Sequence, residues 1–221
     1  MFLDDERSSR LRIGILNDYV GGFLNDVERA NFLGLPPTTR IRERAKIISP
    51  ENLSIGEYCW IGENTVLDAS GGLTIGEHTS IGLNCLVFTH SSWLANMKLE
   101  NRSGSDLIER KAVRIGKGCF IGGNSVIMPG VTIGDCVTVS PLSVVTKDVP
   151  DYCLVSGNPA RVFQRYDQAW IDAEADRVRT ENAARRAEAE AHGEKSSWGS
   201  PRLRLTPTDQ ITSNHNGEEA K

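Results

Sequence analysis

The 221-residue sequence lacks a long apolar run, an excess of basic residues and any closely spaced pair of cysteines. Acidic residues occur from the fourth position, and no segment is apolar enough for a signal peptide or a membrane span, so we expect a cytoplasmic protein. The net charge of -4 argues against electrostatic binding to nucleic acid or to an anionic membrane. The length suits one domain with appendages.

The few cysteines show none of the CxxC spacings that hold metal ions. They are scattered through the middle of the chain, at Cys59, Cys85, Cys119, Cys136 and Cys153. Free, buried thiols in a reducing compartment are the simplest interpretation. We therefore expect neither a disulfide framework nor a cysteine metal site.

What the sequence does contain is an aliphatic residue at every sixth position through its centre. The series comprises Ile55, Ile61, Leu67, Ile75, Ile81, Val87, Ile115, Ile121, Ile127, Ile133, Val139 and Val145. It is interrupted by a two-residue slip before Ile75 and by a longer gap after Val87. Glycine often follows the aliphatic residue, Asn or Gly often comes two positions later, and a small residue follows that. Asn and Gly tolerate a left-handed backbone, so they mark turns.

A period of six fits neither an amphipathic helix nor a half-buried alternating strand. It fits short strands joined by turns, three of which form a triangular coil of about eighteen residues. The sequence therefore predicts a mainly β fold, a parallel β-helix over residues 47–163. The surplus residues of the gap form a loop at about 89–112, extruded from one corner.

The flanking segments lack the repeat. Residues 1–46 are predicted to form short helices that cap the first coil, because an uncapped β-helix would expose unpaired strand edges. Residues 164–194 are rich in Ala, Glu and Arg and predict a helix. Residues 195–221 are polar and are predicted to be disordered.

Histidine is scarce, which narrows the search for a catalytic base. Of the four, His192 and His215 lie in the C-terminal helix and tail. His78 lies in a turn with no loop beside it, where a structural or exposed role is the simpler interpretation. His90, in VFTHSS, lies where the rigid coil meets the extruded loop, and such loops often carry functional sites.

These features together resemble the hexapeptide-repeat acyltransferases, which include galactoside, maltose and capsule or lipopolysaccharide O-acetyltransferases. The resemblance rests on the repeats IGENTV, IGLNCL and IGGNSV, the histidine in VFTHSS, the slip in DASGGLTIG, and the runs FIGGNSVIMPGVTIGD and SVVTKDVPDYCLVSGNPAR. It implies a left-handed coil, a homotrimer with active sites between subunits, acetyl-CoA as acyl donor without a metal, and a sugar or polysaccharide hydroxyl as acceptor.

By the same resemblance, His90 is the general base, whose Nε2 removes the proton of the attacking hydroxyl. Imidazole suits this task because its ordinary pKa is about 6.5. Phe120 lies against the pantetheine arm of CoA, and the phosphates meet cations, as polyanions require. The implied CoA-binding residues are Phe120, Gly123, Pro141, Thr146, Lys147 and Arg161. Asp68, Ser70 and Trp93 are acceptor candidates, because a carboxylate and an aromatic face suit a sugar.

Several alternatives remain open. The galactoside enzymes carry a sugar-contacting asparagine where this chain has Gly62, which favours surface-polysaccharide modification over a free disaccharide. N-acylation of an amino-sugar nucleotide or a drug is a second possibility. A non-catalytic trimeric scaffold is a third. A γ-type carbonic anhydrase needs three histidines around zinc, and the β-helix offers two.

Overall fold

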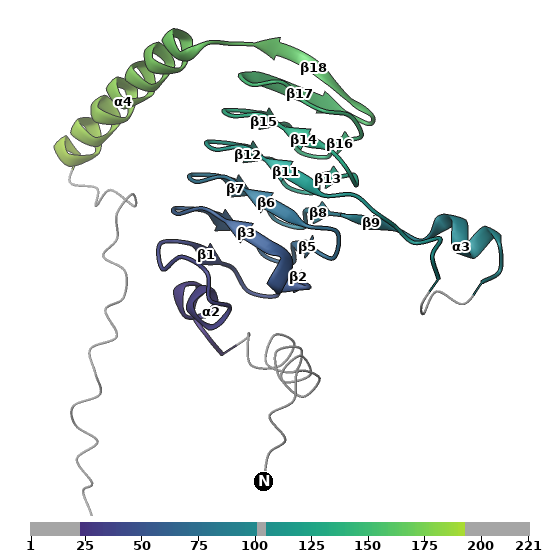
Figure 1. Ribbon diagram of the computed structural model, residues 1–221. Coiled ribbons are helices and arrows are strands. Elements are labelled where there is room, and N and C mark those ends of the chain that lie inside the picture. Colours follow the sequence, from purple (N-terminus) through teal and green to yellow (C-terminus); the bar gives the residue numbers. More distant parts are fainter. Residues whose placement is uncertain (1–22, 101–104, 193–221) are drawn as a thin grey trace, which may run out of the picture. The chain divides into compact units, whose positions relative to one another are not determined.

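The computed structural model describes residues 23–100 and 105–192 and is shown in Figure 1. The chain divides into two units, and the boundary in the sequence follows Gln168. The first contains a parallel β-helix and its N-terminal cap, and the second contains all but the first residue of the helix α4 (Gln168–Ala191). The tail predicted to be disordered, 195–221, lies outside the described residues. No helix in the described ranges is long and apolar enough to cross a membrane.

The strands of the β-helix stack in three sheets, which we call sheets A, B and C. Sheet A contains, in spatial order, β1 (Arg40–Ile41), β4 (Trp60–Ile61), β7 (Ser80–Ile81), β12 (Phe120–Ile121), β15 (Thr138–Val139), β17 (Cys153–Gly157) and β18 (Ala160–Arg165). Sheet B contains β2 (Lys46–Ile48), β5 (Val66–Asp68), β8 (Leu86–Val87), β13 (Val126–Ile127) and β16 (Val144–Val145). Sheet C contains β3 (Leu53–Ile55), β6 (Leu73–Ile75), β11 (Val113–Ile115) and β14 (Thr132–Ile133).

Each coil begins with its strand in sheet A, so the first to sixth coils begin at β1, β4, β7, β12, β15 and β17. The pairing between coils is parallel, and within sheets A, B and C of the described residues only β18 is antiparallel to its neighbour. The aliphatic residues of the repeat stack in register, as Ile61 does on Ile81. Both are fully buried, so the six-residue period builds the core. The predicted parallel β-helix is confirmed.

The corners are held by small polar side chains that bond to the next coil. The hydroxyl of Thr65 donates to the carbonyl oxygen of Gly82 at 2.7 Å, and the thiol of Cys85 donates to that of Gly122 at 3.2 Å. Cys119 makes the same bond, and burial raises its pKa to about 11. The prediction of free buried thiols is confirmed for Cys59, Cys85, Cys119 and Cys153, whereas Cys136 is half-buried.

Glycine after the aliphatic residue is required by close approach of the coils. A Cβ on Gly122 would lie 2.5 Å from the backbone nitrogen of Pro141 in the next coil. The Asn positions of the turns have a left-handed backbone, as at Asn64 (φ 56°) and Asn124 (φ 59°). The turn signals in the sequence therefore identified the correct residues.

Two boundaries differ from those expected. The first coil begins at Arg40 rather than at residue 47, since β1 pairs with β4 through Arg40 and Trp60. This coil also contains a lengthened corner, formed by the 3-10 helix η2 (Pro50–Asn52). Arg42 follows Ile41 where later coils carry glycine, so the repeat signal is weak there. At the other end β18 extends to Arg165, beyond the expected limit at residue 163.

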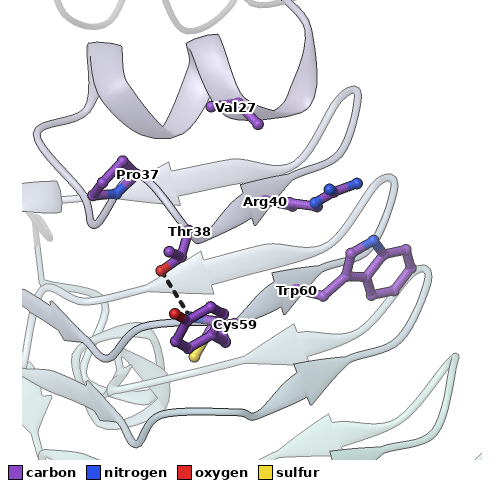
Figure 2. Close-up of a pocket in the computed structure, with 7 residues that line it drawn as sticks. Val27, Pro37, Thr38, Arg40, Cys59 and Trp60 are labelled. Atoms are coloured by element: carbon purple, nitrogen blue, oxygen red, sulfur yellow. Dashed lines mark hydrogen bonds between the residues drawn. The ribbon is translucent and has the colours of Figure 1, made fainter. Parts of the chain in front are cut away.

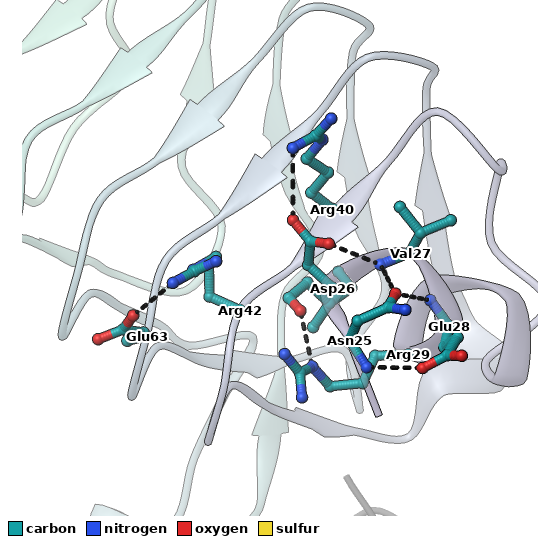
Figure 3. A network of polar contacts seen from close by, with 9 residues as sticks. Asn25, Asp26, Val27, Glu28, Arg29, Arg40, Arg42 and Glu63 are labelled. Carbon is teal, nitrogen blue, oxygen red and sulfur yellow. Dashed lines mark hydrogen bonds and ion pairs between the residues drawn. The ribbon is translucent and has the colours of Figure 1, made fainter. Parts of the chain in front are cut away.

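The N-terminal cap is the short helix α2 (Asp26–Phe32), which begins with a capping box between Asn25 and Glu28. Arg29 leaves this helix toward the first coil and is almost fully buried. Its Nε donates to the carbonyl oxygen of Ile41 at 2.8 Å, as Figure 3 shows. The helix thus satisfies a strand acceptor at the end of the stack, where no further coil lies in the described chain.

Candidate functional site

The extruded loop leaves the β-helix at the corner between sheets B and C, which we call the B–C corner. In the second coil the same corner carries the two-residue slip, residues 69–72. In the third coil it carries the loop, which contains β9 (His90–Ser91), the helix α3 (Trp93–Met97) and β10 (Glu109–Arg110). Figure 1 shows α3 projecting away from the coils. The slip and the loop, separate breaks in the sequence, are neighbours in space.

The base of the loop is a two-stranded antiparallel ladder. β9 pairs with β10 so that Arg110 lies opposite His90. This pairing replaces the tight turn found at the equivalent position of other repeats. His90 is therefore held on a strand, and its side chain is 38% exposed.

Asp68, at the end of β5 in the coil below, binds the imidazole of His90. Its Oδ2 lies 2.6 Å from Nδ1 of His90, and the Oγ of Ser70 lies 3.1 Å from the same nitrogen. A carboxylate can only accept, so Nδ1 carries the hydrogen. In the neutral ring this leaves the lone pair on Nε2, for which the described residues provide no partner.

Asp68 remains ionised although it is fully buried. Burial by itself raises the pKa of its carboxyl group, but hydrogen bonds from Ser70, from the backbone N–H of Thr89 and from His90 outweigh it and lower the pKa to about 2. Thr89 N–H donates to Oδ2 at 2.9 Å, and Ser70 N–H donates to Oδ1 at 3.0 Å. Both carboxylate oxygens are thus satisfied within the protein.

The surroundings of Asp68, one of the acceptor candidates, differ from those expected. Asp68 is fully buried, and its carboxylate binds Nδ1 of His90 instead of facing solvent. Ser70, which was grouped with it, is half-buried and lies beside the imidazole. Trp93, the third acceptor candidate, begins α3 and is 54% exposed.

Thr89 is a site residue that the sequence did not reveal. It is fully buried, its hydroxyl donates to the carbonyl oxygen of Asp68 at 2.9 Å, and it accepts from the N–H of Gly71 at 2.8 Å. A Cβ on Gly71 would lie 2.3 Å from the Thr89 carbonyl oxygen, so only glycine allows this contact. Thr89 was not singled out because its partners lie in the preceding coil, about twenty residues away.

The residues expected to bind CoA lie in the fourth to sixth coils, at four different places. Phe120 begins β12 and is 51% exposed on the outer face of sheet A. Gly123 and Pro141 lie at the corner between sheets A and B, in successive coils. Thr146 and Lys147 are exposed at the B–C corner, two coils beyond His90. Arg161 is exposed on β18, opposite Ser156. One chain does not gather them into a single pocket.

Comparison with known proteins agrees with this architecture. Residues 112–147 match the family model described as bacterial transferase hexapeptide (six repeats). WcaF of Escherichia coli (strain K12), whose name is that of a colanic acid biosynthesis acetyltransferase, is 33% identical over 56% of this chain and 64% of its own length. A dTDP-3-amino-3,6-dideoxy-alpha-D-galactopyranose 3-N-acetyltransferase of Aneurinibacillus thermoaerophilus is 56% identical over 21% of this chain and 24% of its own.

Among solved structures, a hexapeptide-repeat acetyltransferase of Vibrio cholerae complexed with acetyl-CoA superposes with a TM-score of 0.63. It is 29% identical, and the match covers 75% of this chain and 92% of that one. The fold is thus that of the hexapeptide-repeat β-helix proteins. In sequence and in fold, this chain is thus similar to the hexapeptide-repeat acetyltransferases. The chain spans less than two thirds of the length of WcaF.

Proposed function

We propose that this protein is a CoA-dependent acyltransferase that transfers an acetyl group to a hydroxyl of a sugar, polysaccharide or glycolipid. The observation that carries the proposal is the arrangement of His90, with Nδ1 held by a buried carboxylate and a side chain that is 38% exposed. This arrangement suits a general base, because the ring is oriented and Nε2 has no partner among the described residues. The similarity to an acetyltransferase complexed with acetyl-CoA supports acetyl-CoA as the thioester donor.

In the proposed reaction, Nε2 of His90 removes the proton as the acceptor oxygen attacks the thioester carbonyl. The C–O bond forms, the C–S bond breaks, and the protonated imidazole returns its proton to the departing thiolate. Asp68 stabilises the imidazolium while its charge exists, since the carboxylate lies 2.6 Å from Nδ1. Because a thioester is already activated, positioning both substrates supplies much of the rate gain.

The proposed donor site uses exposed residues of the later coils. Lys147 and Arg161 are exposed cations with no acidic partner within ion-pair distance in the described chain, and they suit the phosphates of CoA. Phe120 offers an exposed ring to the pantetheine arm. Since Phe120 and Arg161 lie on strands of sheet A and His90 lies at the B–C corner, we propose a homotrimer in which neighbouring subunits complete each site.

The test is acetyl transfer from acetyl-CoA to sugar acceptors by the full chain, with calorimetry for CoA affinity. We expect His90→Ala to lower transfer by about 10²–10⁴-fold while CoA affinity is retained. His78→Ala is the matched control and should be active, because its ring lies in a turn outside the site. Wild-type turnover in His90→Ala would refute the assignment, and absence of CoA binding by the wild-type chain would favour a scaffold.

N-acylation is the second candidate, favoured by the short, highly identical match to a 3-N-acetyltransferase. The same base could deprotonate an attacking ammonium group. A competition between hydroxyl and amine forms of one sugar acceptor separates the two reactions. Preferential acetylation of the amine would replace O-acylation as the proposed function.

A further inference from the structure

A cavity outside the proposed catalytic centre lies between the N-terminal cap and the first two coils. Its volume is about 350 Å³, and Figure 2 shows the side chains that line it. Val27 and Pro37 form the side nearest the cap. Thr38, Arg40, Tyr58 and Trp60 form the side nearest the coils. None of these residues has a role in the mechanism proposed above.

Tyr58 is held in a conformation that is unusual for an aromatic residue. Its φ of 56° is left-handed, which costs on the order of 1 kcal/mol for a bulky side chain. Its ring stacks on His78 with a centroid distance of 4.8 Å, and its N–H donates to Oγ1 of Thr38 at 3.0 Å. Even so the residue is 56% exposed. Tyr58 therefore presents a braced and exposed aromatic ring at the cavity.

Arg40 adds a positive charge beside a second aromatic ring. It lies next to Trp60 across the β1–β4 pair, so both side chains leave the outer face of sheet A together. One end of the guanidinium is 3.5 Å from Asp26, as Figure 3 shows. The side chain remains 37% exposed, and a guanidinium has five N–H donors. Arg40 is therefore braced and still able to bind an anion.

We propose that this cavity binds an anionic sugar unit of the acceptor, with the ring against Trp60 and Tyr58 and the carboxylate or phosphate on Arg40. Aromatic faces suit the apolar face of a sugar ring, and arginine suits planar or tetrahedral oxyanions. The inference rests on the proposed function. The cavity lies at the first two coils and His90 at the third, whereas the expected CoA-binding residues lie at the fourth to sixth. Along the axis of the β-helix, the cavity thus lies on one side of the level of His90 and the expected CoA-binding residues lie on the other.

The test is calorimetric titration of the full chain, without CoA, with three probes. An oligomer of glucuronic acid supplies carboxylates, UDP-glucose supplies phosphates, and a glucose oligomer is neutral. We expect one anionic probe to bind at least about tenfold more tightly than the neutral one, because a hydrogen bond to a charged group is worth about that much. The anionic probe that binds shows whether the cavity takes a carboxylate or a phosphate.

Variants then assign the binding to the cavity. Arg40→Gln and Trp60→Ala should each weaken it about tenfold or more, and Trp60→Phe should retain most of it. Asp26→Asn, which breaks the ion pair but keeps the guanidinium, should retain binding. Arg42→Gln is the matched control, since Arg42 pairs with Glu63 at 2.9 Å, is 36% exposed and does not line the cavity.

The proposal is overturned if neither anionic probe binds, or if Arg42→Gln weakens binding as much as Arg40→Gln. Acetyl transfer distinguishes this failure from failure of the proposed function. If transfer occurs with an acceptor KM that Trp60→Ala leaves unchanged, only the cavity proposal fails. If the anionic probe binds as described and no transfer occurs with any acceptor, only the proposed function fails.

Discussion

His78 and His90 occupy the same position of the six-residue repeat, three residues after Ile75 and Val87, and the structure gives them different surroundings. His78 lies in a left-handed turn (φ 55°) and stacks on Tyr58. His90 lies on a strand at the base of the loop, with Nδ1 bound to Asp68. The position in the repeat thus places a side chain at a corner. The residues of the neighbouring coil then determine which contacts that side chain makes.

After replacement of His90 itself, the largest effect we expect is from Asp68→Asn. The neutral amide should lower kcat/KM by about 10² or more, because it neither fixes the Nδ1–H tautomer nor stabilises the imidazolium. The measurement is acetyl transfer, with nitrogen NMR of the histidine ring reporting the tautomer. Glu77→Gln, next to His78, is the control and should retain activity. Unchanged turnover in Asp68→Asn would remove the positioning role.

The corner that holds His90 also contains a buried carboxylate, Asp68, whose protonation should make stability depend on acid pH. The pKa of Asp68 is lowered from 3.8 to about 2 in the folded protein. Its contribution to stability is therefore fully present above pH 4 and is lost as the pH falls through about 2. As the pH falls from 5 to 2, the unfolding free energy of the wild type should therefore decrease by about 2 kcal/mol more than that of Asp68→Asn, by the linkage relation.

Urea unfolding of the two proteins at several values between pH 5 and 2 measures that difference. Parallel curves for the two proteins would contradict it. Because this experiment does not use the activity assay, it examines the buried carboxylate of Asp68 independently of the proposed reaction.

The smallest effect concerns His78. Replacing it with Ala removes the stack on Tyr58 and should lower the unfolding free energy by about 0.5–1.5 kcal/mol, the range for aromatic pairs. Denaturant unfolding measures the loss, and transfer activity at saturating acceptor should be unchanged. A strong loss of activity at saturation would erase the contrast between the two histidines.

The β-helix, the buried rows and the position of the loop could be predicted from residues such as Ile61, Ile81 and Gly122, because a repeat states the same local rule many times. The start of the fold at Arg40 could not, since Arg42 and the lengthened corner at η2 depart from that rule. His90 was predicted from its place beside the loop. The sequence predicted that its partner Asp68 would face a sugar. The burial of Asp68 could not be predicted, because it depends on residues of the neighbouring coils.

The sequence by itself determined the repeat, and through it the parallel β-helix, since the same aliphatic, glycine and turn residues recur every six positions. Only the tertiary structure decided that the slip and the loop share one corner. That stacking buries Asp68 beneath Thr89 and places its carboxylate on His90. The physical reason is that coils lie next to one another along the axis, so residues about twenty positions apart become neighbours and set each other's charge and orientation.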